Sequence, residues 1–559
     1  MRSLTKTMFY LLITVSIMAG LFAGCADNPQ TATSQPPATS STAKPSSDSS
    51  GDSTATSETS GDGLFNPVGL PITNEPYTLD ILHVRNQGQG DDYQYSTWFE
   101  QLEKDTNVKP DWITYWNTDW PEKKSIMFAS GDLPSVIFGA NGMTDLDILP
   151  NLSYFIPLND LIDQYMPNLL TAFEIEPDFK TACTFLDGNI YTLPKRLPAR
   201  PQVSFQPFIN KTWLDNLGLA IPDTLDELYE ALKAFKDGDP KGDGSLVVPF
   251  TGSAGNAFFT ESQITTLHGA RANGEGLAVR NGVVTFVPMT EEWKSGMEYL
   301  RNMFADGLMD NEYFTQDGTM ATGKKQNIEQ PMVGLDFGWT PGASFGPWVE
   351  QYITLTPPAN ADGKRFSTYL DNNVMRNEFE ITIYCEYPEI AARWADQFYT
   401  FDAAVQNFWG PFDGHCMEDR DGIWTVLPPT PEENIDFRSW WYSPRDYGPK
   451  FLPLDYENYG VKLDIFPGDG DGLKLSIADI GHPYVEETFP RLCYYTIEQT
   501  EELNSYRADI RALVGTMGAK WISSGGMDDE WDIYLDQLKG VGIERWLEIH
   551  QEAYDAYTL

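Results

Sequence analysis

The chain has 559 residues, of which 41% are hydrophobic and 13% aromatic, and its formal net charge at pH 7 is −43. The excess of 81 acidic over 38 basic residues argues against nucleic acid or an anionic membrane surface as a partner. The length exceeds what a single hydrophobic core holds, so we expect at least two lobes.

The N-terminus combines two basic residues with an apolar run that stops at a cysteine. Residues 9–24 are almost all apolar or small, and they are too few for a membrane span of roughly 20 residues. This pattern predicts a secretory signal. Because the run ends at Cys25, it resembles the lipobox of bacterial lipoproteins, although Phe22 stands where leucine is usual. The resemblance implies a signal peptide over 1–25 and an acylated Cys25 at the extracellular face of the cell membrane; the alternative is an uncleaved anchor.

A low-complexity stretch follows from Asp27 to about Gly63. It consists mostly of Ser, Thr, Pro, Ala, Gly and Asp, with no aromatic residue and no aliphatic side chain larger than alanine. Such a stretch cannot bury enough apolar surface to offset the entropy lost on ordering. We therefore expect residues 26–72 to form a disordered tether.

Short β-rich runs alternate with helical segments in the next part of the chain. A capping box of Thr97 and Glu100 predicts the start of one helix, and a second is expected from Pro121 to Gly131. This alternation predicts an α/β fold with a parallel sheet, whose ligand-binding loops follow the carboxyl ends of the strands. The expected strands are 77–84, 108–116 and 134–139.

A second α/β unit begins near Phe208. Thr224 and Glu227 form another capping box, and the apolar residues after them lie on one helical stripe. A further helix is expected behind Pro388, and two C-terminal helices are expected on either side of residues 540–542.

Several stretches together resemble one family. ASGDLPSVIFG, YFIPLNDLIDQYMPNL, DGNIYTLP, FINKTWLDNLGL and IPDTLDELYEALKAF are similar to the family 1 type of extracellular solute-binding proteins of bacterial carbohydrate ABC transporters. The likeness is to the lipoprotein group that includes the alginate-oligosaccharide-binding proteins, and FWGPFDGHCMEDRDG, EIAARWADQFYTF and GVGIERWLEIHQEAYDAY fit it too. It covers the chain from Tyr77 to Tyr557.

The resemblance implies a two-lobed, type II periplasmic-binding-protein-like fold that closes on ligand by hinge motion. Lobe 1 would comprise 73–205 and 366–415, and lobe 2 would comprise 206–365 and 416–559. A ligand cleft would lie between them.

A sugar offers ring hydroxyls and C–H faces, so its site needs flat aromatic rings and planar polar groups. Trp339 and Phe259 occupy positions where maltose-type binders stack aromatic rings. For each aromatic candidate, plain core packing remains the alternative, and for Arg196 and Arg200 it is a salt bridge between the lobes. The candidate ligand-binding residues are Trp116, Phe138, Asn141, Arg196, Arg200, Phe259, Trp339, Trp440 and Trp441.

No metal or cofactor is expected. In relatives, a calcium loop follows the helix that begins after Thr224, but here Lys241 takes a ligand position and Val247 and Val248 replace acidic residues. The five cysteines include no CxxC pair, so zinc is not expected and disulfides are not indicated. GASFG, at 342–346, matches the letters of a nucleophile elbow, but the flanking prolines favour a loop.

These features favour a non-enzymatic receptor that captures an oligosaccharide and delivers it to an ABC importer permease. We expect a monomer, held at the membrane only by its lipid. The alternatives are a receptor for a peptide or other small molecule on the same fold, a surface adhesin for polymeric glycan, and a glycoside hydrolase.

Overall fold

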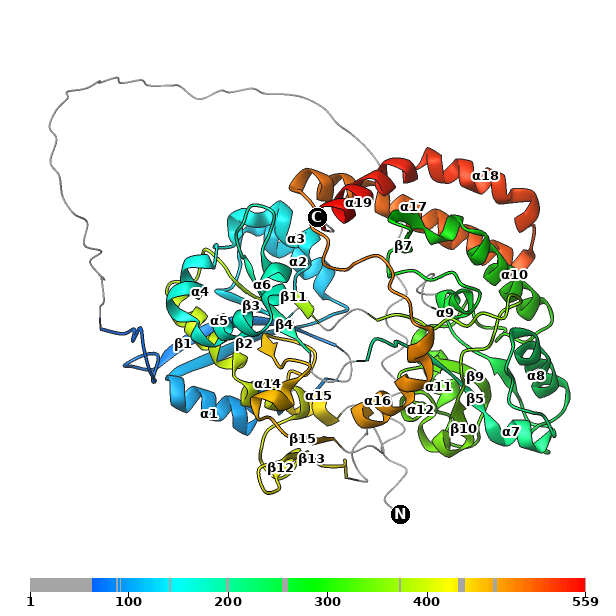
Figure 1. Cartoon of the computed structure of the whole chain (residues 1–559), viewed down its shortest axis with the longest axis horizontal. Coiled ribbons are helices and arrows are strands. Elements are labelled where there is room, and N and C mark those ends of the chain that lie inside the picture. The colour runs from blue at the N-terminus through cyan, green and yellow to red at the C-terminus, as the bar shows by residue number, and fades with distance from the viewer. Residues whose placement is uncertain are drawn as a thin grey trace, which may run out of the picture. The chain divides into compact units, whose positions relative to one another are not determined.

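The two largest sheets of the folded part are separate and covered by helices, and they define two lobes (Figure 1). The structure is a computed structural model, and it describes residues 63–86, 89–90, 92–139, 142–197, 201–253, 260–370, 374–430, 438–465 and 470–557.

Lobe 1 is built on a six-stranded sheet in the order β14-β4-β11-β3-β1-β2. β1 runs parallel to β2 and β3, whereas β11 runs antiparallel to β3 and β4. The strands are β1 Tyr77–Arg85, β2 Val108–Trp116, β3 Val136–Phe138, β4 Thr192–Arg196, β11 Val374–Ile381 and β14 Lys450–Phe451. The helices are α1 Thr97–Thr106, α2 Trp120–Ser130, α3 Asp145–Ile148, α4 Asn159–Tyr165, α5 Pro167–Ile175, α6 Pro177–Cys183, α13 Pro388–Asp396, α14 Phe401–Trp409 and α15 Arg438–Tyr442. A small sheet adds β12 Met417–Asp419, β13 Trp424–Val426 and β15 Leu463–Ile465.

Lobe 2 is built on a four-stranded sheet in the order β10-β5-β9-β6. Its strands are β5 Gln206–Asn210, β6 Val248–Phe250, β9 Val333–Gly338 and β10 Tyr352–Thr354, with a hairpin of β7 Leu277–Arg280 and β8 Val283–Phe286. Its helices are α7 Lys211–Asn216, α8 Leu225–Asp237, α9 Thr260–Leu267, α10 Glu291–Ala305, α11 Gly318–Lys325, α12 Pro341–Phe345, α16 Gly470–Gly481, α17 Ile497–Ser524, α18 Met527–Gly540 and α19 Ile543–Tyr557.

The predicted strands and helices form where the local signals place them, but one of the two predicted capping boxes does not. The three expected strands are β1, β2 and β3, and α2 has Pro121 in its first turn and ends at the left-handed Gly131. The Thr224–Glu227 capping box is present. The Thr97–Glu100 capping box is wrong, because Thr97 is the first helical residue and Ser96 occupies the cap position.

The tether ends earlier than expected. Residues 63–72 belong to the folded body, where Ile72 is fully buried in the lobe 1 core. The guanidinium of Arg393 donates hydrogen bonds to the carbonyl oxygens of Asn66 and Gly69. Backbone hydrogen bonds and one side chain of α13 therefore fix this segment, which unlike the stretch before it contains a phenylalanine and large aliphatic residues.

The lobe boundary also differs from the expected one. Residues 416–465 were expected in lobe 2, but β14 pairs with β4 in the lobe 1 sheet, and Leu452 packs with Leu197. The chain enters lobe 2 only with α16, whose Ile477 packs with Phe208 of β5. Earlier crossings lie at 201–205 and 366–370, which pair through Val203 and Tyr369. Among the described residues, no helix has the length and apolar character needed to cross a membrane.

Candidate ligand-binding site

Trp116 is an exposed ring at the carboxyl end of β2. Its side chain is 42% exposed, although a tryptophan usually gains free energy from burial. The guanidinium of Arg85, at the end of β1, lies 4.7 Å from the ring centroid, and it also donates a 2.6 Å hydrogen bond to the carbonyl of Gln89. A cation over the ring holds it in place without covering it.

α15 and the turn after it bring three more aromatic rings to the same edge of lobe 1. Trp441 is 42% exposed and packs against Gly90, where an added Cβ would lie 3.1 Å from the tryptophan side chain. Trp440 meets Tyr447 edge to face, with ring centroids 5.7 Å apart. The amide of Asn86, directly after β1, donates to the hydroxyl of Tyr447. Loops after β1 and α15 therefore meet as one surface.

Buried charges hold the turn that carries Tyr447. Lys195 of β4 and Glu378 of β11 form an ion pair at 2.6 Å, and both side chains are almost fully buried. Glu378 also accepts a 2.8 Å hydrogen bond from the Gly448 backbone, and Lys195 donates to the carbonyl of Asp446. Lys450 donates to the carbonyls of Tyr447 and Gly448. Burial and the neighbouring Lys195 lower the pKa of Lys450 to about 7.

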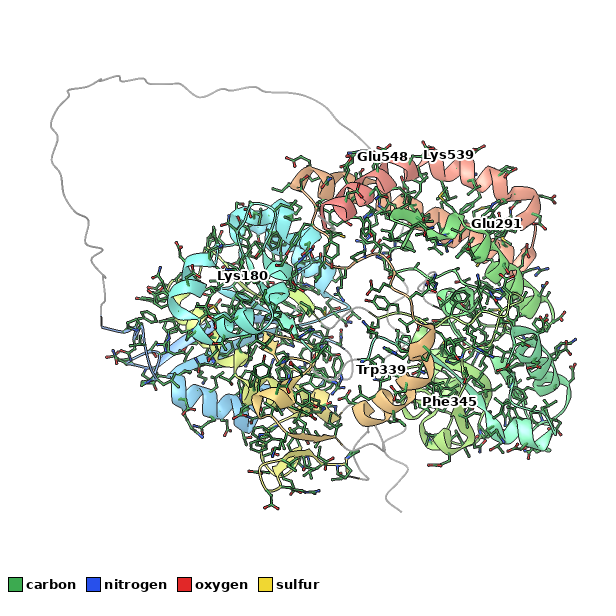
Figure 2. The ribbon with its side chains drawn as sticks, viewed as in Figure 1. Lys180, Glu291, Trp339, Phe345, Lys539 and Glu548 are labelled. Carbon is green, nitrogen blue, oxygen red and sulfur yellow. The ribbon has the colours of Figure 1, made fainter. Side chains whose placement is uncertain are left out.

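Lobe 2 contributes Trp339, which directly follows β9 and lies beside α16 (Figure 2). The ammonium of Lys474, on α16, lies 4.3 Å from the Trp339 ring centroid and also donates to Ser204 in the first crossing segment. One turn earlier on α16, Asp471 pairs with Arg445 of lobe 1 at 2.7 Å. α16 thus connects the Trp339 ring to the turn of Tyr447.

We call Trp116, Trp339, Trp440, Trp441 and Tyr447 the aromatic rim. The four tryptophans are partly exposed, whereas Tyr447 is buried and packs against Trp440. Partly exposed rings beside cations and amides are the chemistry that recognises a polyhydroxylated ligand with apolar C–H faces. The rim contains four of the nine predicted binding residues: Trp116, Trp339, Trp440 and Trp441. Their contact with ligand stays a prediction.

Two predicted residues have other roles. Phe138 is 0% exposed and packs in the lobe 1 core against Trp112, Phe379 and Phe398, so the structure corrects its assignment to a ligand surface. It ends a central strand, and its ring turns into the core. Arg196 pairs with Glu176 at 2.6 Å within lobe 1, so it makes no salt bridge between lobes. Asn141, Arg200 and Phe259 lie outside the described residues.

The loop that resembles a calcium site contains its own cation. The ammonium of Lys241 donates to the carbonyl of Leu246 at 2.6 Å and to the side chain of Gln330 at 3.0 Å. Asp239 accepts hydrogen bonds from the backbone of Gly242 and Gly244. The oxygens that a metal would need are thus already hydrogen-bonded.

The GASFG stretch is helical, contrary to the expected loop. Ser344 lies inside α12 and is 5% exposed, whereas a nucleophile elbow requires the serine at the strand-to-helix turn. Two residues separate β9 from α12. The geometry of this serine does not match the motif.

Several residues of the site carried no usable signal in the sequence. Lys474 and Asp471 are separated from Trp339 and Arg445 by long stretches of chain, so their contacts depend on the assembled fold. Tyr447 stands close to the predicted Trp440 and Trp441, and a search of that whole cluster would have found it. The buried Lys195 is visible only as a lysine inside a strand.

The chain matches known proteins over most of its folded part. Residues 87–356 match the family model described as bacterial extracellular solute-binding protein. The chain is 30% identical over 479 residues to the fructooligosaccharide ABC transporter substrate-binding protein FusA of Streptococcus pneumoniae serotype 4 (strain ATCC BAA-334 / TIGR4), covering 82% of this chain and 86% of FusA.

Two solved structures have the same fold. One is S. pneumoniae FusA in complex with kestose, with a TM-score of 0.76 and 29% identity over 86% of this chain and 99% of that one. The other is the alginate-binding protein AlgQ2 without calcium ion, with a TM-score of 0.69 and 25% identity over the same shares. With these likenesses and its two α/β lobes, the chain belongs to the bacterial extracellular solute-binding proteins.

Proposed function

We propose that this protein captures an oligosaccharide between its lobes and delivers it, unchanged, to the permease of an ABC importer. The observation that carries the proposal is the aromatic rim, which combines half-exposed tryptophans with amide and cationic groups at strand ends of both lobes. The relatives named for fructooligosaccharide and alginate binding support a saccharide over a peptide.

Capture without turnover follows from the same groups. In the closed state both lobes contact the ligand, whereas in the open state only one lobe can. The additional contacts stabilise the closed state, so ligand binding drives closure. The rim offers stacking surfaces and hydrogen-bond donors, but none of its five members is a carboxylic acid that could serve as the acid and base of glycoside hydrolysis. The protein acts as a monomer that meets its permease when closed.

A lipid on Cys25 would keep the receptor near that permease. Two acyl chains anchor a protein stably, whereas one holds it only marginally. Replacing Cys25 with serine should release the protein into the medium with its saccharide affinity unchanged. Equal retention of the two forms on the cell surface would contradict the anchor.

The proposal is tested by thermal unfolding of the full-length protein with kestose, maltotriose, an alginate trisaccharide and a tripeptide. A saccharide at a hundredfold excess over its Kd should stabilise by about 2.7 kcal/mol, and chromatography should recover it intact. Trp339→Ala should reduce this stabilisation. Stabilisation by the tripeptide alone, or cleavage of the bound sugar, would contradict the proposal.

A further inference from the structure

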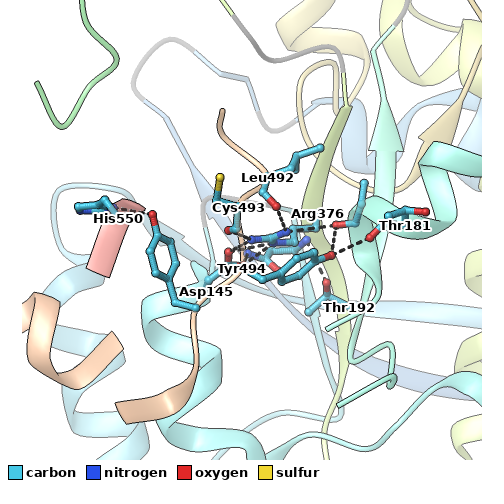
Figure 3. A network of polar contacts seen from close by, with 11 residues as sticks. Asp145, Thr181, Thr192, Arg376, Leu492, Cys493, Tyr494 and His550 are labelled. Carbon is cyan, nitrogen blue, oxygen red and sulfur yellow. Dashed lines mark hydrogen bonds and ion pairs between the residues drawn. The ribbon is translucent and has the colours of Figure 1, made fainter. Parts of the chain in front are cut away.

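A second candidate site lies away from the aromatic rim, beside the segment 485–496, which we call the strap. The strap leads from α16 to α17, both in lobe 2, yet it docks on lobe 1. Tyr494 donates hydrogen bonds from its hydroxyl to the carbonyls of Thr181 and Ala182, and Arg376 of β11 donates to the carbonyls of Leu492 and Cys493 (Figure 3). The Arg376 guanidinium lies 4.1 Å from the centroid of the Tyr494 ring.

The strap covers one side of a cavity of about 590 Å³, which we call the strap pocket. Its walls come from α3 and β11 of lobe 1, from the β7 region, α17 and α19 of lobe 2, and from the strap itself; they include Asp145, Glu275, Tyr369, Asn377, Tyr495 and His550. None of the five rim residues lines it. The volume falls within the range of roughly 300–1,000 Å³ that is typical of ligand pockets.

Four of the five charged residues that line the strap pocket form two ion pairs, and the fifth is Arg491. Asp145 accepts two 2.9 Å hydrogen bonds from Nε of Arg376, and the amide nitrogen of Asn377 donates to it at 2.8 Å. Burial alone would raise the pKa of Asp145, but the charge and hydrogen bonds of Arg376 outweigh it and hold that pKa below its usual value. Across the pocket, Glu275 pairs with Arg507.

Two polar atoms of the pocket residues stay unused. Oδ1 of Asn377 and Nε2 of His550 have no hydrogen-bond partner among the described residues, and both side chains are 94% buried. An unpaired buried polar atom is unfavourable, so a ligand that pairs with it is favoured. Asn377 adopts φ 68°, a left-handed conformation that interrupts the pairing of β11 with β4 and places the amide beside Asp145. Burial lowers the pKa of His550 to about 3, so its imidazole is neutral.

We propose that the strap pocket is a second binding site, and that it takes a neutral saccharide. Hydroxyl groups can donate to an amide oxygen and can either donate to or accept from an imidazole nitrogen, so they suit both open atoms. The half-buried rings of Tyr369 and Tyr495 line the same cavity and match C–H faces. A charged ligand would lose hydration in a pocket whose two partly buried carboxylates are already paired with arginines, whereas a neutral sugar does not carry that cost. This inference goes beyond the proposed function, because it concerns a separate site.

A bulky side chain placed at an exposed lining position tests the strap pocket as a binding site. Asn504 is an exposed residue of α17 that lines the strap pocket, and Ser505 beside it is exposed and does not line it. Asn504→Trp should block the pocket, and Ser505→Trp is the matched control. Thermal unfolding of the two variants checks that both keep the fold, since neither position is buried.

The readout is isothermal titration calorimetry of the full-length protein with kestose, maltotriose and an alginate trisaccharide. A neutral saccharide should bind the wild type and Ser505→Trp at two sites, and Asn504→Trp at one. Trp339→Ala should weaken only the other site by tenfold or more. Equal stoichiometry and affinity in Asn504→Trp and Ser505→Trp for every saccharide would overturn the second site, and a pocket that binds only the alginate trisaccharide would overturn its neutral class. Unchanged saccharide affinity at both sites in Trp339→Ala would instead count against the proposed function.

Discussion

The two lobes hold their rim tryptophans in different ways. In lobe 1, the turn that positions Trp440 and Tyr447 is fixed from below by the buried ion pair of Lys195 and Glu378. In lobe 2, the ammonium of Lys474 lies beside the Trp339 ring. The lobe 1 support is built into the sheet, whereas the lobe 2 support depends on a helix that follows the last crossing of the chain.

This difference predicts which side of the site is rigid. Removing one member of a buried ion pair leaves an uncompensated charge in the core and costs about 3–5 kcal/mol. Removing a cation from beside a ring costs about 0.5–2 kcal/mol. Lobe 1 therefore offers a fixed surface, and lobe 2 supplies the part that adjusts to ligand.

The largest effect should come from Glu378→Gln. Loss of the carboxylate leaves Lys195 buried without its counter-charge, so the free energy of unfolding should fall by about 3–5 kcal/mol. Binding should weaken as well, because the Tyr447 turn loses an anchor. Urea unfolding and saccharide titration measure the two effects.

Glu380→Gln is the matched control for that variant. Glu380 lies on the same strand and is also fully buried, but burial and the neighbouring Glu378 raise its pKa well above the usual value. Its charged form is therefore disfavoured, and glutamine, a neutral side chain of the same shape, should change stability by less than about 1 kcal/mol. Equal destabilisation by the two substitutions would refute the difference in charge state.

The pH dependence of lobe 1 should follow His83. This fully buried imidazole sits among aromatic rings, and its burial lowers its pKa from 6.5 to about 4. Between these values the unfolded chain binds a proton that the folded chain does not, so stability should fall as pH drops from 6.5 to 4. At 1.36 kcal/mol per pH unit the loss is about 3 kcal/mol.

Urea unfolding at pH 7 and pH 4.5 measures this loss in the wild type and in His83→Phe. The phenylalanine variant should lose less stability over that interval, because it removes the group that titrates. His482, which is exposed, gives the control substitution His482→Gln, and its profile should follow the wild type. Identical profiles for His83→Phe and the wild type would exclude His83 as the source.

Lys474→Met should have a moderate effect, confined to binding and to lobe 2. It removes the cation beside Trp339 and the hydrogen bond to Ser204, so saccharide affinity should fall by about 1–2 kcal/mol, or roughly 5- to 30-fold. Lys462→Met changes an exposed lysine of lobe 1 and should leave affinity unchanged. A similar loss in both variants would indicate a general effect of net charge.

The smallest effect should come from removing calcium from the solution with EDTA. Because the Lys241 ammonium bonds to oxygens of the loop, the thermal midpoint should be the same in excess calcium and in EDTA, to within about 1 °C. Lys241→Asn removes that cation and should lower the midpoint slightly. A clear drop of the wild-type midpoint in EDTA would show that this loop binds metal after all.

Local signals predicted much of the fold. β1 to β3 follow from alternating β-rich runs, and α2 follows from Pro121 and Gly131, because these residues act through their own backbone geometry. Lobe membership of residues 416–465 could not be read in the same way. β14 is only two residues long, and its place beside β4 depends on pairing between residues 255 positions apart, such as Lys450 and Lys195.

The site was predictable only in part, for a related reason. Tryptophans beside predicted strand ends could be found, since strand ends mark the edge of the sheet. Whether a ring at that edge turns inward or outward depends on the residues around it. Phe138 ends β3 and is buried, whereas Trp116 ends β2 of the same sheet and is exposed. The supporting charges of Lys195, Glu378 and Lys474 are fixed by tertiary packing.

The central claim is that both lobes close on one saccharide, and small-angle X-ray scattering tests it most directly. The full-length protein is measured alone and with a saturating amount of whichever saccharide stabilises it in thermal unfolding. The account predicts a smaller radius of gyration in the saturated sample and a weaker contraction in Trp339→Ala at the same concentration. An unchanged radius at full saturation of the wild type would contradict it.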